Sequence, residues 1–157
     1  MTPASGLEVP AARFVLGWFD SFELAAVAQA LVVDGYESPS LLLLAGTYPQ
    51  DLPWEGHELL ERSLRELGEP LPSRQEACLV FARDYARRLL DGELTPDGAA
   101  KAILALTYEL STPDALLDVG YLTYELEDHP DYRKEIEQDI LDGARRLLAA
   151  TESGEQA

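Results

Sequence analysis

The feature that most constrains this chain is a series of helix start and stop signals that begins at Ser73. Ser73-Arg74-Gln75-Glu76 fits a capping box, in which the serine hydroxyl accepts a hydrogen bond from the amide of Glu76 and the Glu76 side chain reaches back. Asp91-Gly92 ends the segment that follows. Thr95-Pro96-Asp97 and Thr112-Pro113-Asp114 each place a capping hydroxyl before a proline at the first helical position. These signals predict helices that begin near residues 73, 95 and 112.

Apolar residues behind the start signals recur at spacings of three and four, which is typical of helices with one buried face. The helix after Ser73 has an inward stripe of Cys78, Phe81, Ala82, Tyr85 and Leu89. A final helix over about 131–150 has a second stripe, made of Tyr132, Ile136, Ile140, Ala144 and Leu147. Residues 99–110 carry only Lys101 and Glu109 as charges, so we expect them to form the central, most buried helix.

The first half of the chain has weaker signals. Residues 21–33 predict a helix that ends before Gly35 and turns one apolar stripe inward, namely Phe22, Ala26, Ala30 and Val33. Further helices are predicted over 38–44, closed by Gly46, and over 55–67, ended by Gly68. Residues 47–53 predict a turn-rich connector and 69–72 a stiff extended link, because prolines disfavour helix there. Residues 1–19 are open between helix, strand and loop, and 151–157 are expected to be a frayed tail.

No stretch alternates between apolar and polar residues over a full strand length, so the fold class is predicted to be all-α. A chain of 157 residues can bury about two-thirds of its unfolded surface, so a core can form without a disulfide or a metal. The helical segments are joined by short links of the length found in helical bundles. We therefore expect residues 1–157 to form a single helical domain, a compact bundle of about six to seven helices.

Four blocks of the chain resemble a family of small bacterial helical proteins without assigned function. The blocks are SPSLLLLAG (38–46), ELLERSLRELG (58–68), EACLVFARDYARRLLDGELTPDGA (76–99) and ELEDHPDYRKEIEQDI (125–140). Together they lie within residues 38–148, about two-thirds of the chain. The resemblance implies a bacterial, soluble, all-helical protein. It carries no functional residue over to this sequence.

The charge balance restricts the partners that the protein can have. The chain holds 12 Lys and Arg against 29 Asp and Glu, a formal charge of −17. A chain this negative is repelled by phosphate backbones, which excludes nucleic acid as the expected partner. No uncharged stretch approaches the roughly 18–20 apolar residues of a membrane helix, and no cationic leader precedes the apolar residues 14–19. These features predict a cytoplasmic protein with no membrane partner.

Motifs for catalysis are scarce. The single cysteine, Cys78, lies on an inward stripe, where a thiol is a small inert apolar group. No GxSxG, SxxK or GxxxxGK[ST] pattern occurs, so no cofactor is expected and an enzyme is open but not indicated. The His57/Glu61 pair is spaced to share a helix face, and an acidic cluster near His129 offers oxygen ligands: Glu125, Glu127, Asp128 and Asp131. These groups support the alternative of a metal-dependent hydrolase or metal-binding protein.

Acidic residues are concentrated in one stretch of the chain. Residues 109–142 hold eleven acids and two bases, Arg133 and Lys134, a net charge of −9 over 34 residues. Tyr108, Tyr121, Tyr124 and Tyr132 lie in or beside this stretch. Tyrosines can anchor an interface while carboxylates attract a basic partner, as in protein inhibitors of cationic nucleases.

The preferred hypothesis is a non-enzymatic interaction module, such as an immunity or antitoxin-type inhibitor, that masks a basic protein. The predicted contact residues are Tyr121, Tyr124, Glu125, Asp128, Asp131 and Glu135. Two alternatives are open besides the metal site. The acids can form a solvated face with some tyrosines in the core, as the stripe places Tyr132. Aromatic residues at the start of the chain can form an oligomerisation face, namely Phe14, Trp18 and Phe19.

Overall fold

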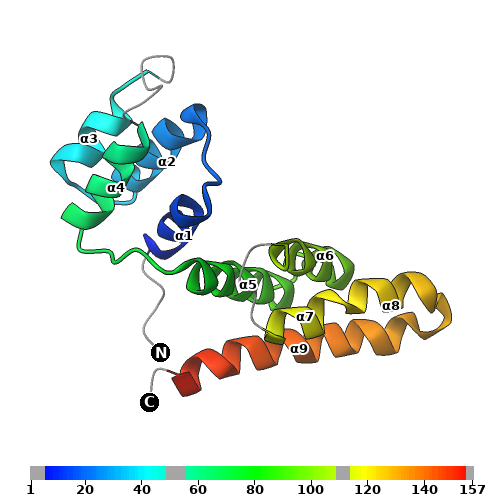
Figure 1. The fold of residues 1–157 in the computed structure, drawn as a ribbon. Helices are drawn as coiled ribbons and strands as arrows, with labels where there is room; N and C mark the ends of the chain where they lie inside the picture. The colour runs from blue at the N-terminus through cyan, green and yellow to red at the C-terminus, as the bar shows by residue number, and fades with distance from the viewer. Residues whose placement is uncertain (1–5, 49–55, 109–113, 155–157) are drawn as a thin grey trace. The chain divides into compact units, whose positions relative to one another are not determined.

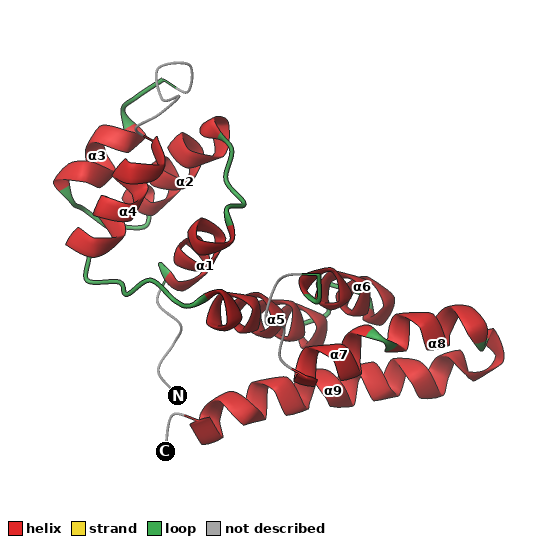
Figure 2. Cartoon of the chain, viewed as in Figure 1, coloured by secondary structure: helices red, strands yellow, loops and turns green. Residues whose placement is uncertain are grey.

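The computed structural model describes residues 6–48, 56–108 and 114–154, leaving out the side chains of 21 and 150–154. Every regular element in these ranges is a helix, and none of them contains a strand (Figure 1, Figure 2). The all-α prediction is therefore confirmed. No helix within the described ranges combines the length and the apolar character required to cross a bilayer.

The chain divides into two compact units, Thr2–Ser73 and Arg74–Ala157, where the sequence predicted a single helical domain over 1–157. The division falls directly after the link over 69–72. Gly68 ends the preceding helix with a left-handed φ of 77°, and Pro70 and Pro72 then disfavour a continuous helix.

The unit Thr2–Ser73 contains α1 (Glu8–Leu16), α2 (Ser21–Val33), α3 (Pro39–Ala45) and α4 (Gly56–Glu66). Of residues 1–19, whose structure the sequence left open, residues 8–16 form helix α1, and residues 1–5 lie outside the described residues. Helix α1 ends at Gly17, whose φ of 74° suits glycine. The predicted helices over 21–33, 38–44 and 55–67 correspond to α2, α3 and α4. The predicted connector 47–53 lies largely outside the described residues. The centre of the core consists of the fully buried Leu24, Leu41, Leu44, Leu60 and Leu64.

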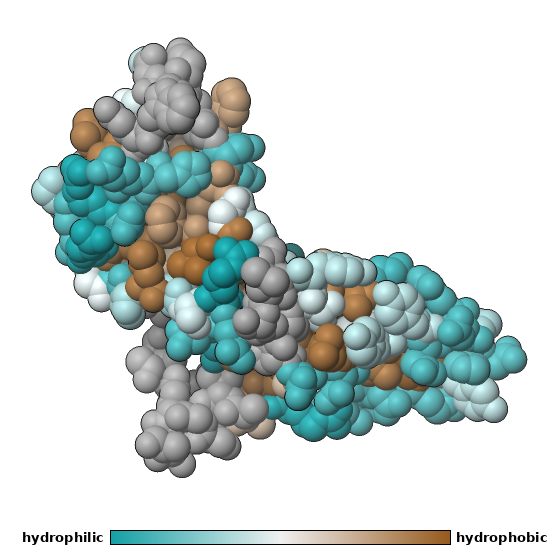
Figure 3. Space-filling model, in the orientation of Figure 1, coloured by the Kyte–Doolittle hydropathy of each residue, from teal (hydrophilic) through white to brown (hydrophobic). Residues whose placement is uncertain are grey.

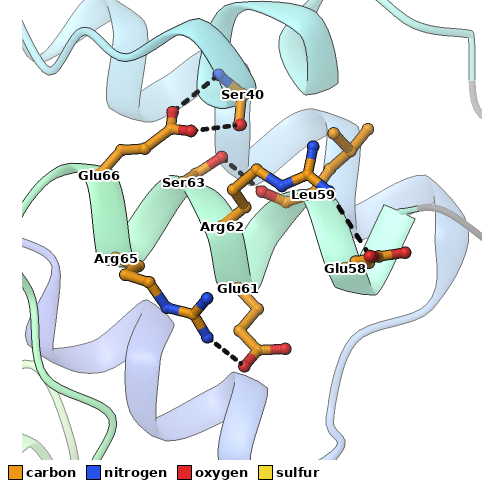
Figure 4. A network of polar contacts seen from close by, with 8 residues as sticks. All are labelled: Ser40, Glu58, Leu59, Glu61, Arg62, Ser63, Arg65 and Glu66. Atoms are coloured by element: carbon orange, nitrogen blue, oxygen red, sulfur yellow. Dashed lines mark hydrogen bonds and ion pairs between the residues drawn. The ribbon is translucent and has the colours of Figure 1, made fainter.

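Polar contacts hold the ends of these helices. The Asp20 carboxylate accepts a hydrogen bond from the amide of Glu23 at 2.8 Å, and Glu23 accepts one from the amide of Asp20 at 2.9 Å. The Ser38 hydroxyl accepts a hydrogen bond from the amide of Leu41 at 3.1 Å. In α4, Arg62 pairs with Glu58 and Arg65 with Glu61, at 3.5 and 3.0 Å (Figure 4). Helices α2, α3 and α4 therefore begin or continue with local contacts that a sequence pattern can predict.

Glu66 joins the end of α4 to the beginning of α3. Its carboxylate accepts hydrogen bonds from the amide of Ser40 at 3.0 Å and from the Ser40 hydroxyl at 2.7 Å (Figure 4). A carboxylate in the last turn of its own helix is disfavoured by that helix dipole, but here it lies at the positive end of α3. The hydrogen bonds from Ser40 lower the pKa of Glu66 below its ordinary value.

The predicted orientation of α2 is wrong. Phe22 is 71% exposed and Val33 85% exposed, and Ala26 and Ala30 of the same predicted stripe are exposed too. The buried residues are Leu24, Ala25, Ala28 and Leu31. Helix α2 has a single charged residue, Glu23, so both of its faces are apolar and the pattern does not fix its rotation.

The unit Arg74–Ala157 contains α5 (Arg74–Leu90), α6 (Pro96–Leu106), α7 (Asp114–Gly120), α8 (Leu122–Asp128), the 3₁₀ turn η2 (Pro130–Tyr132) and α9 (Arg133–Gly154). The Thr95 hydroxyl caps α6 by accepting a hydrogen bond from the amide of Gly98 at 3.0 Å. Helix α9 packs against α5, α6, α7 and α8 (Figure 1). Its side chains from Ile136 to Leu147 form the predicted buried stripe, made of Ile136, Ile140, Ala144 and Leu147.

Two predictions for this unit need correction. Helix α6 stops at Leu106 and exposes Lys101 and Ala105, so the described part of the helix predicted over 99–110 is not buried on most sides. Alanine has little apolar area, so leaving Ala105 exposed forfeits little of the free energy that burial of a larger side chain would provide. Tyr132 is 61% exposed instead of lying on the inward stripe. It belongs to η2, which precedes α9 and has a tighter helical period.

Two glycines allow the helices of this unit to approach closely. A Cβ on Gly120 at the end of α7 would lie 3.0 Å from Cα of Leu104 in α6. A Cβ on Gly143 in α9 would lie 2.7 Å from Cγ2 of Val119 in α7. A side chain at Gly120 therefore requires the backbone of α6 to give way, and one at Gly143 requires the Val119 side chain to move.

Candidate protein-binding surface

Helix α8 separates its residues into a buried and an exposed face. Thr123 and Leu126 are buried against the rest of the unit. The opposite face contains Tyr121, Tyr124, Glu125 and Asp128, whose spacings of three and four place them side by side. All four are exposed. The local pattern of α8 therefore presents two phenol rings and two carboxylates to solvent.

Tyr121 and Tyr124 form a cluster with a third tyrosine from another helix. Their ring centroids lie 6.1 Å apart with an angle of 37° between the planes. Tyr108, two residues beyond the end of α6, shares a side-chain hydrogen bond with Tyr124. Tyr108 is 78% exposed, Tyr121 53% and Tyr124 46%. We call these three residues the tyrosine cluster.

The pKa of Tyr124 is raised above its ordinary value of 10.0. The main cause is the hydrogen bond with Tyr108, followed by charge repulsion from the same residue and by partial desolvation. Tyr121 and Glu127 add weaker repulsion. A phenol is already neutral at physiological pH, and this shift makes ionisation of Tyr124 still less favourable.

The connection from α8 to α9 adds a second aromatic pair beside the cluster. The rings of His129 and Tyr132 meet edge to face with centroids 6.4 Å apart. His129 Nε2 lies 3.8 Å from the Glu125 carboxylate. Asp131 in η2 and Glu135 in the first turn of α9 are exposed. All six residues predicted to contact a partner are thus at the surface of the same unit.

The charges within this unit are unevenly distributed along the chain. Residues 74–108 contain five acids and five bases, a net charge of zero, whereas residues 109–157 contain thirteen acids and four bases, a net charge of −9. The segment that holds α5, α6 and the link between them is thus balanced, and the excess negative charge belongs to the segment that holds α7, α8 and α9. In Figure 3 the surface over α8 and the beginning of α9 is mostly hydrophilic.

Several carboxylates around α8 are not neutralised. Arg133 pairs with Glu137 at 2.9 Å, and Arg145 with Asp142 at 3.0 Å. Four other acids make no hydrogen bond or ion pair with any residue that the structure describes, namely Glu127, Asp128, Asp131 and Glu135. The acidic tyrosine surface, as we name it, consists of the tyrosine cluster, Tyr132, Glu125 and these four acids.

The predicted metal ligands are not brought together. His57 Nε2 lies 3.3 Å from the carbonyl oxygen of Phe19, to which it can donate a hydrogen bond, and Glu61 pairs with Arg65. The acids near His129 offer it only Glu125 at 3.8 Å. Within the described ranges, no group of three or more His, Cys, Asp or Glu side chains is arranged to hold a metal ion. Cys78 is buried in α5, as the sequence predicted.

The aromatic residues at the start of the chain belong mainly to a core. Phe19 is buried, and the Arg13 guanidinium lies 4.1 Å from the centre of its ring. Phe14 packs against the same core cluster. Phe14 and Phe19 therefore contribute to the core of this unit, and little of the Phe19 side chain is exposed for an oligomeric interface.

Comparison of this chain with protein-family models, with curated proteins and with solved structures finds no match. The resemblance of residues 38–148 to small bacterial helical proteins therefore stays a prediction.

The tyrosine cluster was only partly predictable. Tyr121 and Tyr124 are three residues apart, a spacing that by itself indicates one helix face. Tyr108 joins them because α6 and α8 pack together, and no pattern within the sequence relates those two helices.

Proposed function

We propose that this chain is a non-enzymatic interaction module whose acidic tyrosine surface binds a basic protein. The observation that carries the proposal is the exposure of all four tyrosines of the acidic stretch beside carboxylates without ion pairs. A tyrosine with this exposure contributes little to folding, since less than about half of its surface is removed from water in three of the four cases. At an interface the same ring supplies a large contact area at low entropic cost.

The charge distribution supports a basic partner. Carboxylates that are already paired with arginine add little to the field around a protein, whereas Glu127, Asp128, Asp131 and Glu135 keep their charge. Such a field attracts a cationic protein from a distance and can raise its association rate by roughly 10- to 1,000-fold. An immunity or antitoxin-type inhibitor of a cationic toxin in the bacterial cytoplasm is the concrete form of this proposal.

The test is affinity capture from a bacterial lysate with charge-reversed baits. The first bait is Asp128→Lys with Asp131→Lys, which changes the charge of the acidic tyrosine surface by +4. The matched control is Asp34→Lys with Glu37→Lys, the same change at two exposed positions of the other unit. Capture is compared at about 0.1 M salt, where the Debye length is about 10 Å, and at about 1 M, where it is about 3 Å.

We expect the unmodified chain and the control to retain a basic protein at low salt and to release it at high salt. The Asp128/Asp131 variant should retain little of it, with unchanged circular dichroism. Capture that ignores salt, or an equal loss with both variants, would refute the proposed surface.

A further inference from the structure

The tyrosine cluster allows the chemistry of the partner to be narrowed. Its ring faces are partly exposed, and the two rings of α8 are tilted, so they do not cover one another as a parallel stack would. Glu125 and Asp128 share the helix face of these rings, and Glu127 is close enough to Tyr124 to affect its pKa. Exposed aromatic faces next to free carboxylates suit a cation that is flat, poorly hydrated and rich in N–H donors.

We infer that the tyrosine cluster binds arginine side chains of the basic partner, with guanidinium groups stacked on the rings of Tyr121 and Tyr124 and donating hydrogen bonds to Glu125 and Asp128. This inference rests on the proposed function, because it specifies the contact made by the same surface. Arginine is favoured over lysine because the guanidinium group is planar, stacks on aromatic faces and pairs with a carboxylate through two parallel N–H groups.

The part of the chain that the structure describes contains an example of this combination. The Arg13 guanidinium lies 4.1 Å from the centre of the Phe19 ring while Nη2 pairs with Glu23 at 3.3 Å and donates to the carbonyl oxygen of Trp18 at 3.2 Å. One guanidinium group can therefore contact a ring and a carboxylate simultaneously. At the acidic tyrosine surface the ring and carboxylate parts are present, and the described arginine nearest along the chain, Arg133, is paired with Glu137.

The negative charge of the acidic tyrosine surface favours a separate basic protein as its ligand over a nucleic acid or a second copy of this chain. A nucleic acid would bring phosphates toward a segment with a net charge of −9. A second copy of this chain would bring a net charge of −17, although the balanced segment 74–108 contains arginines of its own. Self-association is therefore measured alongside the test, by light scattering at the concentrations used.

The test is a nuclear magnetic resonance titration of the full chain with three blocked tripeptides: triarginine, trilysine and tricitrulline. Citrulline has nearly the shape of arginine but no charge, and lysine has the charge but no planar guanidinium group. We expect triarginine to bind several-fold more tightly than trilysine and tricitrulline not to bind. The arginine side-chain protons should show upfield shifts from the tyrosine rings, and binding should weaken at about 1 M salt.

The variants separate the ring contribution from the charge contribution. Tyr121→Leu with Tyr124→Leu should weaken triarginine binding by about 5- to 30-fold, as expected for two exposed cation–π contacts. Tyr121→Phe with Tyr124→Phe keeps the rings and should retain most of the affinity. Tyr48→Leu, at an exposed tyrosine of the other unit, is the control and should have no effect.

The outcomes distinguish this inference from the proposed function. Salt-dependent binding of triarginine and trilysine with equal affinity, unaffected by the leucine variants, would overturn the stacking and leave the proposed function standing. Binding of neither cationic peptide at low salt would count against both. Self-association that competes with the peptide would show that a second copy of this chain, and not a separate basic protein, binds the surface.

Discussion

Two substitutions two residues apart in α2 test which face of this helix is buried. Leu24 is fully buried, whereas Phe22 is mostly exposed and lies on the stripe that the sequence pattern turned inward. Replacing each by alanine removes a large apolar side chain and leaves helix propensity as good or better. Any difference between the two variants therefore reports packing.

The expected magnitudes follow from burial. Removing a buried leucine costs about 2–5 kcal/mol of unfolding free energy, because contacts are lost and a cavity remains. Complete burial of a phenylalanine is worth about 3 kcal/mol at most on the transfer scale, and less than a third of Phe22 is buried. We therefore expect Leu24→Ala to cost about 3 kcal/mol and Phe22→Ala less than about 1 kcal/mol.

Urea unfolding followed by tryptophan fluorescence measures this difference, because Trp18 and Trp54 both belong to the unit Thr2–Ser73. With a slope of about 1–3 kcal/mol per molar urea, Leu24→Ala should lower the midpoint by about 1 M or more. Val33→Ala is the control at a still more exposed position and should leave the midpoint unchanged or slightly raised. A loss for Phe22→Ala equal to or larger than that for Leu24→Ala would refute the orientation of α2.

Three further predictions concern single contacts. The pKa of Glu66 lies below its ordinary value of 4.5 because Ser40 stabilises the carboxylate. The ionised carboxylate therefore stabilises the folded state fully above pH 4.5, and this stabilisation is lost as the pH falls through the pKa of the folded state. The melting-temperature difference between the unmodified chain and Glu66→Gln should thus shrink on acidification, and a growing difference would contradict this. Gly143→Ala should lower the free energy of unfolding, measured with urea, by about 1–3 kcal/mol, and adding Val119→Ala should restore part of it. If the effects of the two substitutions were additive, the side chains at positions 143 and 119 would not be in contact. Thr123→Val should raise the free energy of unfolding by roughly 1 kcal/mol, since the buried Thr123 hydroxyl has no hydrogen-bond partner among the described residues. A lower urea midpoint for this variant would show that the hydroxyl does have a partner.

Local signals predicted the helices well where a cap or a glycine marks the boundary. The Ser38 hydroxyl caps α3 and the Thr95 hydroxyl caps α6, each through the amide three residues later, as their positions before a proline suggested. Gly17 and Gly68 end their helices with a positive φ. These interactions join residues three to five apart, so the sequence contains all the information that they need.

The residues that share the candidate surface of α8 were predictable from local spacing, but their exposure to solvent was not. The spacing of Tyr121, Tyr124, Glu125 and Asp128 indicates one face of a helix, but it does not say which side of that helix meets solvent. The pattern placed Tyr132 in the core, because it assumed that the final helix started before this residue. Tyr108 was included only as one of the tyrosines in or beside the acidic stretch, and its proximity to Tyr124 could not be predicted.

The amino-acid sequence by itself determined the all-helical class, the positions of most helix ends and the accumulation of negative charge after residue 108. These properties depend on residue type and on neighbours within one helical turn. Tertiary packing decided the rotation of α2, the separation into two units and the meeting of Tyr108 with Tyr124. An apolar helix with one charge can bury either face, and only the fit of its side chains against the other helices favours one of them.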